Sequence, residues 1–330
     1  MMPMSPKPET TKPGATLKPD SMPALEWQSL LQIGVIYAAW PALTWFQANI
    51  PTWVLLPAGA IVIAGHGSFQ HETIHGHPTK FASINWALAF PPIALWLPYQ
   101  SYLRSHLAHH KSAVTDPLDD PESNYFSQPQ WERLGVVGRF LAKANATLLG
   151  RMIIGPVWSI GSFLMQEGQE VLRGDVTRRR IWVVHLAGVC IVLAWVLLAC
   201  HMSLARYILC FVYPGTSLAL VRSFAEHRAA DEPGNRTAIV EGGRFWELLF
   251  LNNNLHVVHH VHPSLPWYHL PAVYRQNREA YLCLNGGLVY RSYGDIFARY
   301  FLRPHDRLIH PGHRIASDTA HGSSQEKTED

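Results

Sequence analysis

Four apolar segments constrain the fold of this chain more than any other feature of its sequence. An α-helix needs about 20 residues to cross the ~30 Å hydrocarbon core of a membrane, and each segment is close to that length or longer. They run from about Trp27 to Ile50, Pro51 to Phe69, Ile181 to Cys200 and Leu204 to Phe224. Only short gaps separate the first from the second and the third from the fourth. The sequence therefore predicts an all-α integral membrane protein with about four transmembrane helices in two hairpins, plus interfacial helices.

Two further apolar stretches are less regular. The one from Ile84 to Tyr99 is interrupted by three prolines. We expect a broken helix there, or one that lies in the membrane plane, because a straight span would leave backbone groups unpaired in lipid. The other stretch, from Leu148 to Leu164, leaves open a count of five or six spans.

The position of positive charge predicts the orientation. Arg178–Arg180 directly precede the third segment, and basic residues beside a span mark its cytosolic end. An even number of crossings then places both termini inside, and we expect a bacterial inner-membrane protein. Residues 1–24 and 311–330 are polar and predict disordered tails on a membrane domain of residues 25–310, whose cytosolic cap is helical.

Composition agrees with the membrane class and excludes others. Apolar residues make up 48% of the chain and charged residues only 15%, which is little charge for a soluble protein. A net charge of +3, with basic residues scattered apart from the one arginine run, gives no patch for nucleic acid. The four cysteines have no paired spacing, and we interpret them as core thiols, with no disulfide framework and no iron–sulfur site.

Histidines gather in three short clusters. The positions are His71 and His75 in HxxxH, then His106, His109 and His110 in HxxHH, and finally His256, His259 and His260 in a second HxxHH. On a helix these spacings share a face, so each cluster is expected to direct its rings at a common point. Composition alone predicts roughly 0.06 copies of HxxHH in a chain of this length. Chance is therefore a poor explanation for two copies.

Metal is the simplest common partner for eight imidazoles beside apolar spans, because each ring would otherwise need a polar partner of its own. Zinc takes about four ligands, whereas two iron ions can take four or five imidazoles each and keep a position open for O2. His227, just beyond the fourth segment, is a candidate ninth ligand. We interpret His185 and His201, at the two ends of the third segment, as ordinary structural histidines.

The stretches HETIHGH, RSHLAHH and NNNLHVVHH, in this order, resemble the histidine boxes of the membrane fatty acid desaturase superfamily. That superfamily includes acyl desaturases, alkane hydroxylases, carotenoid ketolases and alkene-forming fatty acid decarboxylases. The likeness covers about Gly65 to Leu270 and implies a non-haem di-iron centre, O2 as co-substrate and a lipid substrate. The iron ligands that it implies are His71, His75, His106, His109, His110, His227, His256, His259 and His260.

Other polar residues near the boxes are candidates for supporting roles. Metal-bound imidazoles usually donate their second N–H to a carboxylate or carbonyl. Candidates beside the ligands are Glu72, His77, Asp116, Asp119, Asp120, Glu226, Asn252, Asn253, Asn254 and His262. The acidic run DPLDDPE, which starts at Asp116, is equally consistent with a solvated turn. Candidates for binding a carboxylate or phosphate head group are Arg104, Arg151, Arg222 and Arg228.

The function predicted from these features is O2-dependent oxidation of an unactivated C–H bond in a fatty acid or acyl lipid, with desaturation the commonest form. Hydroxylation of a lipid or alkane, and oxidative decarboxylation to a terminal alkene, would use the same ligands and stay open. A zinc-dependent membrane hydrolase would need fewer histidines and a general base. A metal transporter would place its polar residues inside the spans.

Electrons are expected to come from a separate protein. His310-Pro-Gly-His313 is similar to the haem-binding stretch of cytochrome b5, but too few residues follow it to complete such a domain. The resemblance to the desaturases implies a ferredoxin, a rubredoxin or a cytochrome b5 with its reductase.

Overall fold

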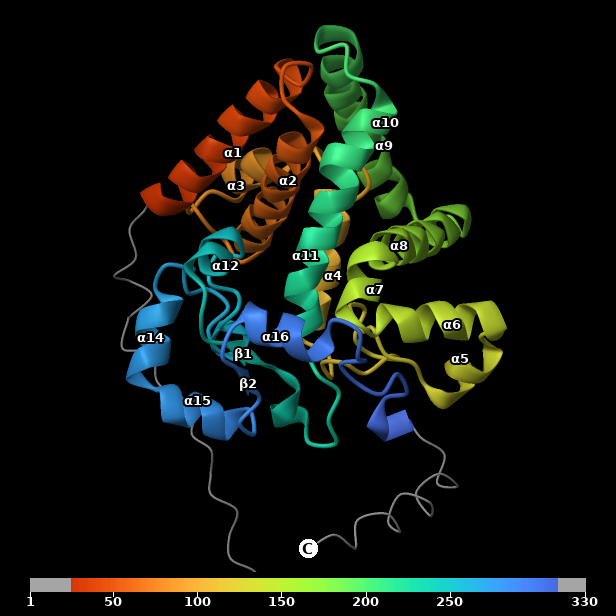
Figure 1. Ribbon diagram of the computed structural model, residues 1–330, viewed down its shortest axis with the longest axis vertical. Helices are drawn as coiled ribbons and strands as arrows, with labels where there is room; N and C mark the ends of the chain where they lie inside the picture. Colours follow the sequence, from red (N-terminus) through yellow and green to blue (C-terminus); the bar gives the residue numbers. More distant parts are fainter. Residues whose placement is uncertain (1–24, 314–330) are drawn as a thin grey trace, which may run out of the picture.

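The computed structural model describes residues 25–313 and is mostly helical (Figure 1). Of the two predicted tails, residues 1–24 and 314–330 lie outside the described residues. The three remaining tail residues form the 3-10 turn η5 (Pro311–His313).

The first predicted hairpin is formed by α1 (Trp27–Trp45) and α2 (Thr52–Ile74), which pack against each other. Pro51 stands at the N-cap of α2, where its missing N–H removes no helical hydrogen bond. The second segment was expected to end near Phe69, but α2 continues to Ile74. His71 therefore lies inside the last turns of this helix, and His75 follows directly as its C-cap.

The second hairpin consists of two long helical rods. The first is α9 (Val176–Leu193), which continues as the π-helix η2 (Ala194–Ala199). The return rod consists of α10 (Leu204–Tyr207), the π-helix η3 (Ile208–Val212) and α11 (Tyr213–Glu226). The two hairpin turns lie side by side, because Arg206 Nη2 donates to the carbonyl of Gln47 (2.9 Å).

Small residues let the two hairpins pack closely. A Cβ added at Gly215 on α11 would overlap Ile63 on α2, and one added at Gly59 would lie 2.9 Å from the Phe211 ring. Leu55, Val196 and Phe211 are buried in the core between the hairpins. Close approach through small side chains is the usual way in which membrane helices gain packing energy.

Three helical segments are long and apolar enough to span a membrane: Thr52–Ile74, Val176–Ala199 and Leu204–Glu226. The first of the four predicted spans forms α1, but among the described helices it is not one of these candidates. Large apolar side chains on α9, such as Val183 and Ile191, are exposed, as expected for a surface that contacts lipid.

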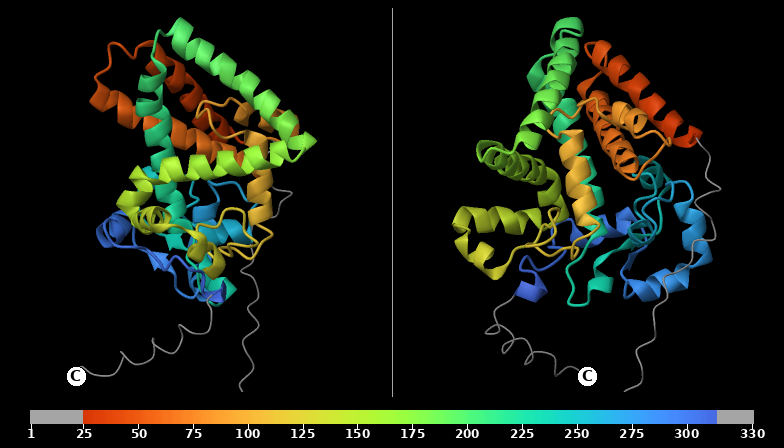
Figure 2. Two further views of the ribbon diagram at one scale, coloured as in Figure 1. Left: turned by 90° about the vertical axis from the view of Figure 1, so that its right-hand side faces the viewer. Right: turned by 180° about the vertical axis from the view of Figure 1, so that it is seen from behind.

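The two irregular stretches are not candidate spans. The first forms α3 (Ala82–Ala89) and then a series of turns, which is the broken helix that its prolines predict. The second is divided into α7 (Leu148–Ile153) and α8 (Gly155–Leu172). In Figure 2, α8 lies across the direction of the hairpin rods.

Eleven elements remain among the described residues. One of them, α4, packs on α2 and α9, and the others form a cap at the end of the molecule opposite the hairpin turns (Figures 1 and 2). The eleven elements are α4 (Tyr99–His109), α5 (Gln128–Arg133), α6 (Val136–Asn145), η4 (Pro233–Arg236), β1 (Ile239–Val240), α12 (Arg244–Leu249), α13 (His256–Val261), α14 (Leu270–Gln276), α15 (Arg278–Leu284), β2 (Val289–Tyr290) and α16 (Tyr293–Tyr300). The strands β1 and β2 pair in parallel. The C-terminal ends of α2 and α11 both point into this cap.

The cysteines only partly match expectation, whereas His185 agrees with it. All four cysteines are free, but Cys190 and Cys283 are exposed and are not core thiols. Cys190 lies on α9, whose apolar residues are largely exposed because the helix packs on few neighbours. His185 is buried and bonded to the carbonyl of Leu95 (2.8 Å), which fits a structural role.

Candidate metal centre

Two groups of four histidines meet where α2 and α11 enter the cap. Within each group, one nitrogen from every ring lies within 4.8 Å of the corresponding nitrogens of the others. The first group is His71, His75, His106 and His259, and the second is His109, His227, His256 and His260. The rings come from four separate elements, so the groups exist only in the folded chain.

Each HxxHH box is divided between the two groups. His256 and His260, four residues apart on α13, both join the second group, whereas His259 joins the first. On α4 the division is reversed, since His106 joins the first group and His109 the second. We expected each box to converge on one point. This was wrong for the two HxxHH boxes, whereas His71 and His75 of the first box do share one group. The residue at the i+3 position is rotated far enough around a helix to face a neighbouring site.

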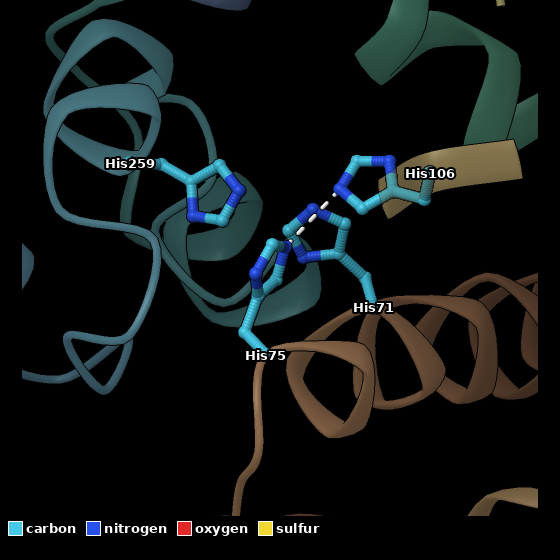
Figure 3. A group of neighbouring side chains, drawn as sticks. All are labelled: His71, His75, His106 and His259. Carbon is cyan, nitrogen blue, oxygen red and sulfur yellow. Dashed lines mark hydrogen bonds between the residues drawn. The ribbon is translucent and has the colours of Figure 1, made fainter. Parts of the chain in front are cut away.

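The first group is shown in Figure 3. His71 and His75 extend from the end of α2 toward His106 on α4 and His259 on α13. The Nε2 atoms of His75 and His106 lie 3.2 Å apart. His110 is outside the group of four, but its Nε2 lies 3.1 Å from that of His106 and 3.2 Å from that of His259. His110 is therefore placed to act with the first group.

The second group is centred on His227, which follows the end of α11. Its Nε2 lies 3.1 Å from that of His109 and 2.9 Å from that of His256. The Nε2 of His260 is 3.1 Å from that of His256. The chain beyond the last candidate span thus contributes a ring to the cluster, at the position predicted for a ninth histidine.

Burial keeps most of these rings neutral. It lowers the pKa of His75 to about 2 and that of His110 to about 3, and the neighbouring histidines add to the effect. The same causes hold the pKa values of four other rings well below the usual range: His227, His256, His259 and His260. For His109, burial acts in the same direction, but the hydrogen bond to Asp120 and nearby carboxylates outweigh it and raise the pKa. Neutral imidazoles carry the lone pair that a metal needs.

The donor set fits metal ions. His71 Nε2 is buried and has no hydrogen-bond partner among the described residues, although buried polar atoms are normally paired. Neighbouring Nε2 atoms lie only 2.9 to 3.2 Å apart. Nitrogen-rich sites of this kind suit iron and other transition metals, so the residues present are suitable ligands for the di-iron centre that the histidine boxes imply.

Hydrogen bonds to the outer ring nitrogens orient the histidines. His109 Nδ1 donates to Asp120 (2.8 Å) and His106 Nδ1 donates to Glu122 (3.2 Å). With Nδ1 as the donor, Nε2 is left as the acceptor that faces the cluster. Glu122 was not among the residues singled out from the sequence. It belongs to the acidic run DPLDDPE, in which Asp120 is buried beside His109 whereas Glu122 is partly exposed.

The second group has an amide in the same role. His256 Nδ1 donates to Asn253 Oδ1 (3.0 Å), and Asn253 Nδ2 donates to Glu226 (2.7 Å). Glu226 in turn lies 2.9 Å from Arg222 Nε. His227 Nδ1 donates to a backbone carbonyl (3.3 Å). These bonds connect the rings to the end of α11.

Three other candidates for supporting roles form contacts that hold the chain around the metal centre. Glu72 lies 3.8 Å from His71 and accepts from the Trp267 N–H (3.3 Å). His77 pairs with Glu26 (2.5 Å), a partner that sequence reasoning did not identify because it lies at the start of α1. His262 contacts the Tyr281 hydroxyl.

The remaining candidates hold loops in place. Asn252 and Asn254 donate to backbone carbonyls, at 3.0 and 2.6 Å. Asp119 accepts from the Ala113 N–H, and Asp116 pairs with His313 (2.8 Å). The HPGH stretch therefore closes onto the acidic run.

A cavity of about 680 Å³ adjoins the histidines and extends between α4, α8 and α11. Its lining includes the apolar side chains Trp96, Phe163 and Leu220, as well as His106 and His109. A cavity of this volume with a partly apolar lining is of the size and character that small-molecule ligands occupy.

The four head-group candidates have different surroundings. Arg104, Arg151 and Arg222 line the cavity, whereas Arg228 is paired with Asp306 (3.0 Å). Arg104 is exposed and Arg222 is paired with Glu226. Arg151 is buried, and burial lowers its pKa to about 10. It therefore stays protonated at neutral pH.

Comparison with known proteins agrees with this geometry. The family model described as fatty acid desaturase matches residues 34–294, which include all nine histidines. None of the curated proteins compared with the chain matches it in sequence. A match over most of the chain argues against a zinc-dependent hydrolase or a transporter. The chain belongs to the fatty acid desaturase family and is a membrane enzyme of the di-iron oxidoreductase class.

Proposed function

We propose that this enzyme uses O2 to oxidise an unactivated C–H bond of a fatty acid or acyl lipid, with desaturation as its main reaction. The observation that carries the proposal is that histidines of both groups, His106 from the first and His109, His227 and His256 from the second, line a partly apolar cavity. Family membership supports a lipid substrate.

In this proposal the nine histidines are the iron ligands. One iron would be held by His71, His75, His106, His110 and His259, and the other by His109, His227, His256 and His260. When bound, the iron pair supplies the capacity to reduce O2 and to remove hydrogen from an unactivated carbon.

The protein orients these rings and positions the substrate. Asp120, Glu122 and Asn253 fix the ring tautomers through hydrogen bonds to Nδ1. Apolar side chains such as Phe163 line the cavity and exclude water from the chain of the substrate.

The overall reaction needs two electrons from an external electron donor. A –CH2–CH2– unit, O2, two electrons and two protons give –CH=CH– and two molecules of water. We propose a ferredoxin, a rubredoxin or a cytochrome b5 with its reductase as the donor. Hydroxylation, or loss of CO2 from a free acid, would proceed from the same ligands, and the products tell these reactions apart.

We further propose that the metal centre faces the cytosol of a bacterial inner membrane. Arg178–Arg180 begin α9 away from the hairpin turns, at the end of the rods where α2 and α11 enter the cap. Basic residues at that end support a cytosolic location. The domain of residues 25–310 would then lie in and below the membrane, between its two polar tails.

The test is turnover by the purified, iron-loaded protein with a reducing system and O2. Palmitate, palmitoyl-CoA and hexadecane are supplied separately, and products are identified by mass spectrometry, including volatile alkenes and CO2. We expect O2-dependent conversion of at least one of these compounds to an oxidised product. Product formation that is unchanged under strict anaerobiosis would contradict the proposal.

A further inference from the structure

Arg151 is a buried cation in the cavity wall that has no carboxylate partner among residues 25–313. Its residue is only 7% exposed, and it lies on the short helix α7. Nε donates to the carbonyl of Asn145 (3.2 Å) and Nη1 donates to Asn124 Oδ1 (2.9 Å). None of the arginine ion pairs between residues 25 and 313 involves Arg151.

Two other arginines that line the cavity show the contrast. Arg222 lies 2.9 Å from Glu226, and Arg178 lies 2.5 Å from Glu167. Their charges are already balanced by the protein. A buried charge without a counter-ion is unfavourable, so the cavity beside Arg151 is electrostatically suited to an anion.

The position of Arg151 places that anion near the metal centre. Asn124, which accepts from Arg151, is two residues from Glu122, whose carboxylate accepts from His106 (3.2 Å). The Arg151 guanidinium also lies 5.9 Å from the centre of the Phe224 ring, and Phe224 precedes His227 by less than one helical turn. Through these contacts Arg151 adjoins segments that lead to one histidine of each group, His106 and His227.

The rest of the cavity suits an alkyl chain. Trp96 and Phe163 pack edge to face, with ring centres 5.6 Å apart, and both line the cavity together with Leu220. A ligand with a charged end at Arg151 and an apolar body along these side chains would use both parts of the space. A free fatty acid has this shape and this charge.

We propose that Arg151 binds the carboxylate of an unesterified fatty acid, with the head group inside the cavity and the carboxyl half of the chain closest to the histidines. This inference rests on the proposed function for the identity of the lipid. A guanidinium pairs with a carboxylate through two parallel hydrogen bonds. The ester or thioester carbonyl at the end of a bound acyl chain carries no negative charge at this position, so the preferred substrate is the free acid.

Equilibrium binding tests the inference without turnover. The full chain is purified in detergent, and the affinities for palmitate and hexadecanol are measured without reductant. The two ligands share one chain and differ in the charged head group. The wild type is expected to bind palmitate more tightly. Arg151→Gln is expected to weaken palmitate binding by about tenfold to a hundredfold and to leave hexadecanol binding unchanged.

A second variant guards against a folding defect in Arg151→Gln. Asn124→Asp keeps the shape of the side chain that accepts from Arg151, but supplies a carboxylate that neutralises the guanidinium. It should weaken palmitate binding selectively as well. Arg299→Gln is the matched control, because Arg299 is exposed on α16 and bonded to Asp295. This control is expected to bind both ligands as the wild type does.

Two results would overturn the inference. One is palmitate affinity at the wild-type level in both Arg151→Gln and Asn124→Asp. The other is selective loss of palmitate binding in Arg104→Gln alone, which would place the head group at the exposed arginine. Because binding is measured without reductant and therefore without turnover, a failure of the proposed oxidation leaves this test unaffected, and the two proposals can fail separately.

Discussion

The two histidine groups are built in different ways. The first is anchored by His71 and His75 at the end of the long helix α2, and its one carboxylate hydrogen bond comes from Glu122, whose side chain is 30% exposed. The second draws its rings from shorter elements and the end of α11. There the side chain of Asp120, which accepts from His109, is only 2% exposed.

This difference indicates what positions the histidine rings in each group. Rings at the end of a rigid, well-packed helix are positioned mainly by the backbone. Rings on short elements depend more on their outer hydrogen bonds, and such bonds are stronger when buried. We therefore expect the second group to be the more sensitive to changes around its ligands.

The largest expected effect comes from removing a ligand of the second group. His109→Ala should lower activity by more than about a hundredfold and reduce bound iron from roughly two ions per chain to roughly one. Iron is measured by elemental analysis of the purified variant. Loss of both ions would show that the groups are not separate sites and would break the comparison.

Removal of the buried carboxylate is expected to have the next largest effect. Asp120→Asn should weaken iron binding by about tenfold to a hundredfold, because the amide no longer fixes the His109 tautomer. Competition with a chelator measures the affinity. Wild-type affinity in this variant would show that the hydrogen bond to Asp120 does not hold the ring in place.

The matched change in the first group sharpens the contrast. Glu122→Gln should weaken iron binding by less than about tenfold, since the carboxylate is partly exposed and α2 positions two rings without it. The same chelator competition applies. A loss larger than that of Asp120→Asn would reverse the order that we infer for the two groups.

Lowering the pH should have the smallest effect, a gradual decrease in the free energy of unfolding. The pKa of His75 is lowered to about 2 and that of His110 to about 3, whereas both are near 6.5 in an unfolded chain. The unfolded state therefore binds more protons below pH 6.5, and the free energy of unfolding should fall as pH decreases from about 6.5 toward 3. His109, with its raised pKa, acts instead above pH 6.5, where the folded state binds more protons and the stabilisation is lost as pH rises.

Thermal unfolding of the metal-free protein across this pH range measures the effect. The melting temperature should fall below pH 6.5, whereas above it only His109 contributes and should lower the melting temperature slightly as pH rises. A melting temperature that rises steadily on acidification would show that the rings are not buried in their neutral form.

The sequence predicts the helical elements well because the signals are local. Apolar length identifies α2, α9 and the rod that ends in α11, and prolines correctly predict the break after α3. The span predicted at α1 is less secure, since the helix forms but is not apolar enough to be a candidate.

The division of the histidines is not visible in the sequence. Spacing shows that His256 and His260 share a face, but it cannot show that His259 turns toward rings from α2. That depends on how α13 packs in the cap beside the ends of α2 and α11, which is a tertiary property. For the same reason, Glu122 is hidden in an acidic run, and Arg151 looks no different from the other arginines until its partners are known.

The most direct test of the central claim is X-ray absorption at the iron edge, combined with metal analysis of the purified protein. We predict roughly two irons per chain, each surrounded mainly by imidazole nitrogens, with the signal of one site lost in His109→Ala. A single zinc ion in a closed tetrahedral site, or iron bound chiefly through oxygen or sulfur ligands, would contradict the account.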